Sequence, residues 1–99
     1  MADTASTPQL LPLRRPGVKV DHSEAEPALV SGSDGRRFVL NETAVVLWEL
    51  CDGATSPEEM ITAICGLFAT DRLQVAGDVD RALDRFSRRG LIEWRTDAD

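Results

Sequence analysis

The chain has 99 residues, with 17 acidic and 11 basic side chains and a formal net charge of −6. This length allows one small domain, and the 25 Leu, Ile, Val and Phe residues exceed the share typical of disordered chains. The longest uninterrupted apolar run is residues 44–48, and the sequence shows no signal segment, so it predicts neither export nor a membrane span.

The first half of the chain predicts a tail followed by a small sheet. Residues 1–16 contain three prolines and no helical or alternating pattern, so we expect a flexible N-terminal tail and a domain that begins at residue 17. Residues 17–20 and 28–31 are short β-prone runs. The second run is followed by Gly-Ser-Asp-Gly and then by residues 36–40, which indicates a hairpin. The sequence therefore predicts a three-stranded antiparallel sheet.

The stretch LNETAVVLWELCDG, residues 40–53, predicts one capped helix. Its apolar positions follow the helical period at i, i+3, i+4 and i+7, namely Ala44, Leu47, Trp48 and Cys51. Asn41 is a suitable N-cap, because its side-chain oxygen can accept a hydrogen bond from a backbone amide of the first turn. Gly53 suits the left-handed conformation that ends many helices.

Cys51 and Asp52 raise the question of catalysis. A nucleophilic thiolate needs a positive environment or a neighbouring base, whereas Cys51 lies at the negative end of its predicted helix beside Asp52, which would raise the thiol pKa. We therefore predict that Cys51, and Cys65 in the next helix, are core residues. The two cysteines and the single histidine, His22, match neither a zinc site nor a disulfide framework. We expect no metal, no cofactor, no enzymatic activity and a reducing cytoplasm as the compartment.

The second half of the chain predicts two more helices and a strand. Residues 56–59 (Ser-Pro-Glu-Glu) are a capping-box sequence that begins a helix ending near Ala69. A third helix is expected over residues 78–89, and residues 91–95 are expected to form a closing strand. The acidic residues 96–99 are expected to be a C-terminal tail.

These elements predict one α+β domain over residues 17–95, winged helix-turn-helix-like, with a three-stranded antiparallel sheet followed by three helices and a short closing strand. This shape makes a DNA-binding or regulatory role the alternative function. The net charge opposes it, since phosphate contacts supply most of the affinity for DNA and the third predicted helix carries Asp78, Asp80 and Asp84. The predicted connection of residues 70–77 is also longer than a helix-turn-helix turn. We expect no nucleic-acid partner.

Positive charge is concentrated in the third predicted strand and the third predicted helix. Residues 36–40 sum to +2 and residues 81–95 to +3, whereas residues 41–80 sum to −7. Ten of the eleven basic residues are arginine, whose planar guanidinium suits bidentate binding of carboxylates. Arg88 and Arg89 could equally serve only to complement the negative end of their helix.

The segment LNETA, followed by six residues and CDG, and then by DVDRALDRFSRRGLIEW, resembles the PqqD family over about residues 14–95. The resemblance implies a non-catalytic peptide chaperone, a stand-alone RiPP recognition element that binds the leader of a ribosomally synthesised precursor peptide. Such a chaperone presents the precursor to a modifying enzyme, either a radical S-adenosylmethionine protein in pyrroloquinoline quinone synthesis or a leader protease or other maturase in related pathways. The compact turn at residues 31–35 is shorter than in quinone-pathway members, so a lasso-peptide or another peptide pathway stays open.

The resemblance also implies where the leader binds, namely as a strand added to the edge of residues 36–40 in a groove against the third helix. The candidate peptide-binding residues are Arg36, Arg37, Phe38, Val39, Arg81, Ala82, Arg85 and Arg88. Their charges favour an acidic leader, while the face of the strand that meets it stays open. A free strand edge can also pair with its own copy, so we expect a monomer or a weak homodimer without a membrane partner.

Overall fold

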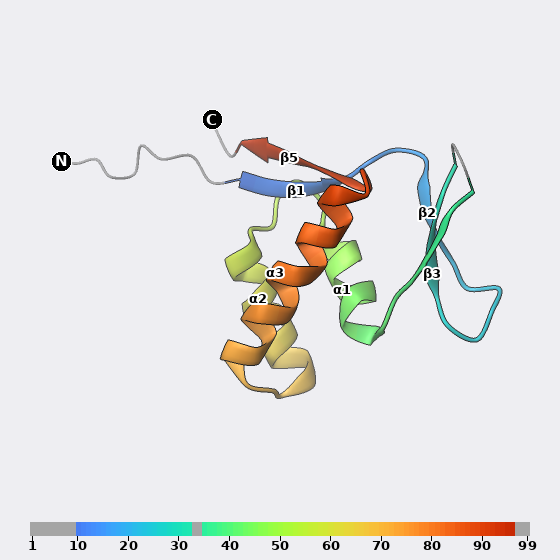
Figure 1. Cartoon of the computed structure of the whole chain (residues 1–99). Helices are drawn as coiled ribbons and strands as arrows, with labels where there is room; N and C mark the ends of the chain where they lie inside the picture. The colour runs from blue at the N-terminus through green and yellow to red at the C-terminus, as the bar shows by residue number, and fades with distance from the viewer. Residues whose placement is uncertain (1–9, 33–34, 97–99) are drawn as a thin grey trace.

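The computed structural model describes residues 10–32 and 35–96 (Figure 1). The elements follow in the order β1 (Leu10–Arg14), β2 (Val18–Asp21), β3 (Ala28–Ser31), β4 (Arg37–Val39), α1 (Glu42–Leu50), α2 (Pro57–Phe68), α3 (Arg72–Arg88) and β5 (Ile92–Thr96). The strands form two antiparallel sheets, one of β1 and β5 and one in the order β2-β3-β4. The α+β architecture predicted from the sequence, with its three-stranded antiparallel sheet, three helices and closing strand, is confirmed.

β3 lies at the centre of the three-stranded sheet, and the register sets which side chains face the core. Val20, Leu29 and Phe38 occupy one cross-strand row, and all three are buried in the apolar core or packed against it. Because side chains alternate along a strand, Arg37 and Val39 point to the opposite face. β4 has a strand neighbour on one side only among the described residues, so its other edge can pair with a further strand.

α1 and α2 begin at their predicted caps. Oδ1 of Asn41 accepts a hydrogen bond of 2.8 Å from the amide of Ala44. In α2 the amide of Ser56 donates to the Glu59 carboxylate at 2.8 Å, and the amide of Glu59 donates to the Ser56 hydroxyl at 3.1 Å. These bonds satisfy amides that lack a partner within the first helical turn, so both helix starts are specified by residues three positions apart.

α3 runs over Arg72–Arg88, so the predicted start at residue 78 was wrong. Asp71 is the N-cap and accepts a hydrogen bond of 3.2 Å from the amide of Gln74. Buried Val75 extends the apolar stripe of α3 through the segment that was predicted to be a loop. Gly77 lies inside α3, although a glycine costs a helix about 1 kcal/mol relative to alanine. The packing of α3 against α2 outweighs that cost.

The connection between α2 and α3 therefore consists only of residues 69–71. Ala69 turns the chain by adopting the left-handed conformation, with φ of 50°. The prediction of a long connection was wrong, and its length does not argue against a helix-turn-helix. The charge argument stands, since Asp78, Asp80 and Asp84 all lie on α3.

β1 is formed by residues that were predicted to belong to a flexible tail. Leu10–Arg14 pair with β5 along their whole length, so the tail prediction was wrong for these residues. Thr96 is the last residue of β5, so the prediction of an acidic tail over residues 96–99 was wrong for this residue. Residues 15 and 16 follow β1 directly, and the predicted tail residues 1–9 and 97–99 lie outside the described part of the chain. Pro12 made a strand hard to predict from the sequence. Proline has no amide to donate and is confined to sheet edges, so a segment that contains it is seldom predicted to be a strand.

β1 also joins the turn that follows α1. The amide of Gly53 donates to the carbonyl of Pro12, and the amide of Arg14 donates to the carbonyl of Cys51, both at 2.9 Å. The Arg14 guanidinium donates to two carbonyls of the last residues of α1, at 3.1 and 2.7 Å. A cation there complements the negative end of the helix, so β1 stabilises both β5 and the end of α1.

The core lies between the inner face of the three-stranded sheet and the three helices. The rings of Trp48 on α1 and Phe86 on α3 meet edge to face, with 5.6 Å between their centroids. Fully buried side chains from the sheet, all three helices and the segment before β5 belong to the same core cluster: Leu29, Leu47, Met60, Ile64, Val79 and Leu91. None of the helices in the described ranges is long and apolar enough to cross a membrane.

The role of β1 in stability can be tested with two adjacent leucines. Leu11 is 7% exposed and Leu10 is 54% exposed. We expect Leu11→Ala to lower the free energy of unfolding by about 2–4 kcal/mol, because it leaves a cavity in the core. The matched control Leu10→Ala should change it by less than about 0.5 kcal/mol. Urea denaturation measures both, and equally small effects would show that β1 does not pack against the core.

Candidate functional site

A groove of about 430 Å³ lies between the free edge of β4 and α3, with α1 as its floor. β4 and the residues after it form one wall, and α3 forms the other wall. The apolar part of the lining is contributed by Phe38, Leu40, Ala44, Leu47, Ala82, Phe86 and Leu91, and the polar part includes Asn41, Thr43, Asp78 and the arginines of β4 and α3. The groove therefore combines an apolar base with a strand edge whose backbone can accept a further strand.

Six of the eight candidate peptide-binding residues line this groove: Arg37, Phe38, Val39, Arg81, Ala82 and Arg85. Arg36 and Arg88 do not line it. The carbonyl of Arg36 accepts the Ser31 amide at 3.1 Å in the turn between β3 and β4. Nε of Arg88 forms an ion pair of 3.0 Å with Asp84, one helical turn back on α3.

Sequence reasoning missed Arg89, which lines the groove. Arg81 and Arg85 of α3 and Arg89, its C-cap residue, recur every four residues and lie on one side of the helix, which we call the arginine face. This spacing was the signal that could have found Arg89. Arg88 lies seven residues beyond Arg81, so spacing alone does not separate it from this side of α3, but it pairs with Asp84 and does not line the groove. The α1 residues of the floor, such as Leu47, could not have been predicted as site residues, because their sequence pattern is that of ordinary core residues.

The three cations of the arginine face differ in their partners. Nη2 of Arg81 pairs with Asp78 at 2.5 Å. Cζ of Arg89 lies 4.5 Å from the centroid of the Phe38 ring, a cation–π contact that links α3 to β4 across the groove. Arg85 has no carboxylate within ion-pair distance among the described residues, so its charge is the one most available to an acidic ligand.

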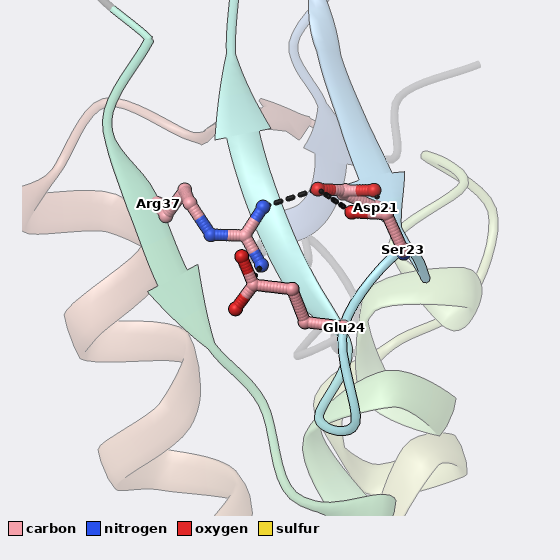
Figure 2. A network of polar contacts seen from close by, with 4 residues as sticks. All are labelled: Asp21, Ser23, Glu24 and Arg37. Atoms are coloured by element: carbon pink, nitrogen blue, oxygen red, sulfur yellow. Dashed lines mark hydrogen bonds and ion pairs between the residues drawn. The ribbon is translucent and has the colours of Figure 1, made fainter.

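Arg37 lies on the outer face of the sheet, where it braces β4. Figure 2 shows its side chain reaching over β3 towards β2, where its guanidinium pairs with Asp21 and, at 3.8 Å, with Glu24. Asp21 also accepts hydrogen bonds of 3.0 Å from the amide and the hydroxyl of Ser23. The Ser23 amide bond and then the Arg37 bond lower the pKa of Asp21 to about 2. The charge of Arg37 is thus already matched by Asp21 of β2 and Glu24 of the loop that follows β2.

The interactions of the Asp21 carboxylate with Arg37 and Ser23 predict that the free energy of unfolding depends on pH in the acid range. A carboxyl whose pKa is lowered on folding stabilises the fold above its unfolded pKa, near 3.9, and loses that contribution as pH falls towards about 2. We expect Asp21→Asn, which keeps an acceptor for Ser23 but removes the charge, to unfold at lower urea concentration than the wild type at pH 6. This difference should narrow steadily between pH 4 and pH 2.

Arg37→Gln and the double variant complete a thermodynamic cycle for this pair. The coupling between the two substitutions should be present at pH 6 and should decline over the same acid range. A coupling that is constant with pH would show that the ion pair is not its source.

Cys51 is fully buried at the end of α1, which confirms the prediction of a core residue. Burial raises the pKa of its thiol to about 12, with a smaller contribution from Asp52 and an opposing one from Arg14. Asp52 braces the following turn by accepting hydrogen bonds from the Ala54 amide at 2.8 Å and the Thr55 hydroxyl at 3.2 Å. The Cys-Asp-Gly sequence therefore ends a helix.

The burial of Cys51 predicts its behaviour towards thiol reagents. In a Cys65→Ser variant, which isolates Cys51, iodoacetamide at pH 8 should leave the native protein unmodified and label it fully in urea. Mass spectrometry measures both states. The reciprocal Cys51→Ser variant reports on Cys65, which is half-buried. Rapid stoichiometric labelling of native Cys51 would contradict the buried, inert thiol.

The chain is similar to one known protein family and to solved structures of leader-peptide complexes. The family model described as "Coenzyme PQQ synthesis protein D (PqqD)" matches residues 21–92, from the end of β2 to the start of β5. A solved structure described as "TbiB1 in Complex with the TbiA(beta) Leader Peptide" is 27% identical, with a TM-score of 0.68, covering 82% of this chain and 94% of that chain.

A second solved structure, described as "Lasso peptide synthetase B1 complexed with the leader peptide", is 18% identical, with a TM-score of 0.70. The match covers 83% of this chain and 96% of that chain, and at this identity it bears on the fold alone. No curated protein matched the chain.

Proposed function

Since the chain belongs to the PqqD family, we propose that it is a peptide chaperone that binds the leader of a ribosomally synthesised precursor peptide and has no catalytic activity of its own. The similar structure at 27% identity is a complex with a leader peptide and is matched over almost its whole length, which supports this assignment. The observation that carries the proposal is the groove between the unpaired edge of β4 and the arginine face of α3.

Strand addition to β4 is the proposed binding mode. An extended peptide would form backbone hydrogen bonds with the free edge and place alternate side chains in the groove. β4 spans only Arg37–Val39, so the backbone pairing is short and groove contacts must supply much of the affinity. Phe38 points to the core side of the sheet, which makes the inner face of β4 the face that shares the apolar groove with the leader.

We further propose that the leader is acidic with apolar anchors. Arg85 would pair with a leader carboxylate, because the guanidiniums of Arg37 and Arg81 already have carboxylate partners. The aromatic and aliphatic floor around Phe38 and Phe86 would take the anchors. Arg36 and Arg88 were both expected at the site from the sequence. They would contribute at most to the positive electrostatic potential around the groove.

The role requires a second protein, an enzyme that modifies the precursor once its leader is bound. A radical S-adenosylmethionine protein or a leader protease of a RiPP pathway would fill it. The reducing cytoplasm is the proposed compartment, in keeping with the free thiols of Cys51 and Cys65.

Isothermal titration with a synthetic leader peptide tests the proposal, using the leader encoded by a short open reading frame beside this gene. We expect one-to-one binding by the wild type. Arg85→Glu should weaken leader binding roughly tenfold or more. The substitution replaces the available cation of the groove with a carboxylate, which repels an acidic leader. Arg88→Glu, the same change outside the groove on the same helix, should alter the Kd by less than about threefold.

N-methylated leader peptides sharpen the test. A leader with single backbone N-methylations should bind more weakly wherever the methyl group removes a donor to β4, because strand addition depends on these amides. Equal losses in Arg85→Glu and Arg88→Glu would argue for non-specific charge attraction instead of groove binding. Absence of leader binding, together with salt-dependent binding to duplex DNA, would favour the winged-helix alternative.

A further inference from the structure

A second groove, of about 300 Å³, lies on the other side of α3, between α3, α2 and β5. Its floor is apolar and includes Ile61, Val79 and Leu83, while Asp80 and Asp84 line it from α3. Among the described residues no basic side chain lines this groove, and it shares no lining residue with the groove at β4. We call it the acidic groove.

Exposed apolar side chains extend the acidic groove at both of its ends. Trp94 of β5 closes one end, 38% exposed, with its indole Nε1 donating to the Ser87 hydroxyl at 3.3 Å. Towards the other end lies Leu73, which is 84% exposed. Leu73, Asp80 and Ser87 are spaced by seven residues, about two helical turns each, and so share one side of α3.

The same holds for α2, where Phe68 lies seven residues beyond Ile61 and is 38% exposed. Phe68 and Leu73 are exposed apolar side chains near the connection between α2 and α3, where the neighbouring Arg72 reaches from α3 to α2 and pairs with Glu58 at 2.6 Å. The α3 residues that line the acidic groove run from Ala76 to Ser87, about 17 Å at 1.5 Å per residue, the length of a helix of about three turns.

Charge and shape together indicate the occupant. An apolar trough of this length between two helices suits the apolar side of an amphipathic helix. Asp80 has no cation within ion-pair distance among the described residues, and Asp84 has only Arg88. A basic side chain on the edge of the incoming helix would find a carboxylate there, and an exposed tryptophan suits a cation as well.

We propose that the acidic groove docks a basic amphipathic helix of the enzyme that acts on the bound precursor. This proposal rests on the proposed leader-binding function. α3 then separates the two partners, with the leader on its arginine face and the enzyme on its acidic side, so both bind at once. A second copy of this chain fits less well, because its largest cluster of basic residues is the arginine face that the leader needs.

The test uses the full chain and the purified modifying enzyme encoded beside the precursor gene. Biolayer interferometry measures binding of this enzyme, and isothermal titration measures leader binding. Asp80→Arg and Leu73→Glu change exposed residues of the acidic groove surface, so we expect each to weaken enzyme binding roughly tenfold or more and to leave the leader Kd within about twofold. Glu26→Arg, the same charge reversal in the loop between β2 and β3, is the matched control and should change neither.

Arg85→Glu should give the opposite pattern, with leader binding weakened roughly tenfold or more and enzyme binding unchanged. If the wild type binds no leader, the proposed function fails first. If the wild type binds the leader but not the enzyme, or if the acidic-groove variants bind the enzyme like the wild type, the docking proposal alone is overturned. A wild-type dimer in analytical ultracentrifugation that Asp80→Arg dissociates would assign the surface to a second copy and also overturn it.

Discussion

Burial of one apolar stripe of α3 is the constraint on which both grooves depend. Val79, Leu83 and Phe86 are each at most 5% exposed, and Phe86 packs edge to face on Trp48 of α1. Close packing of this kind gives the helix one rotational setting. In that setting the arginine face lines the groove at β4, whereas Asp80 and Asp84 line the groove between α3, α2 and β5.

An unpaired strand edge is useful for peptide binding only if the strand is held in place, and β4 is held from both faces. On the outer face Arg37 ties it across β3 to Asp21 of β2. On the inner face Phe38 contacts the guanidinium of Arg89 from α3. A strand fixed before binding spares an incoming peptide part of the entropy of ordering its partner. Charged side chains on the same strand also oppose pairing with an identical edge.

The arginine face gives this acidic chain a local preference for acidic ligands, which its net charge of −6 does not predict. The arginine face is a short-range feature, since charges beyond about 8–10 Å are screened at physiological salt. In the proposed complex the leader and the enzyme lie on opposite sides of a single helix, separated by about 10–12 Å. Holding both at that spacing raises the effective concentration of the precursor at the enzyme.

The sequence by itself determined the features that depend on neighbours within a few residues. These were the caps at Asn41 and Ser56, the hairpin of β3 and β4, the end of α1 at Cys51, and the gathering of arginines on β4 and α3. Only the tertiary structure decided the rest. β1 forms a strand because it pairs with β5, about 80 residues later in the chain. The local sequence around Pro12 does not predict this pairing. Likewise the packing of α3 against α2 carries the helix through Gly77, and the rotation of α3 in the core decides that Arg89, and not Arg88, faces the groove. Strand pairing and helix orientation are non-local contacts, and their energies outweigh local preferences of about 1 kcal/mol.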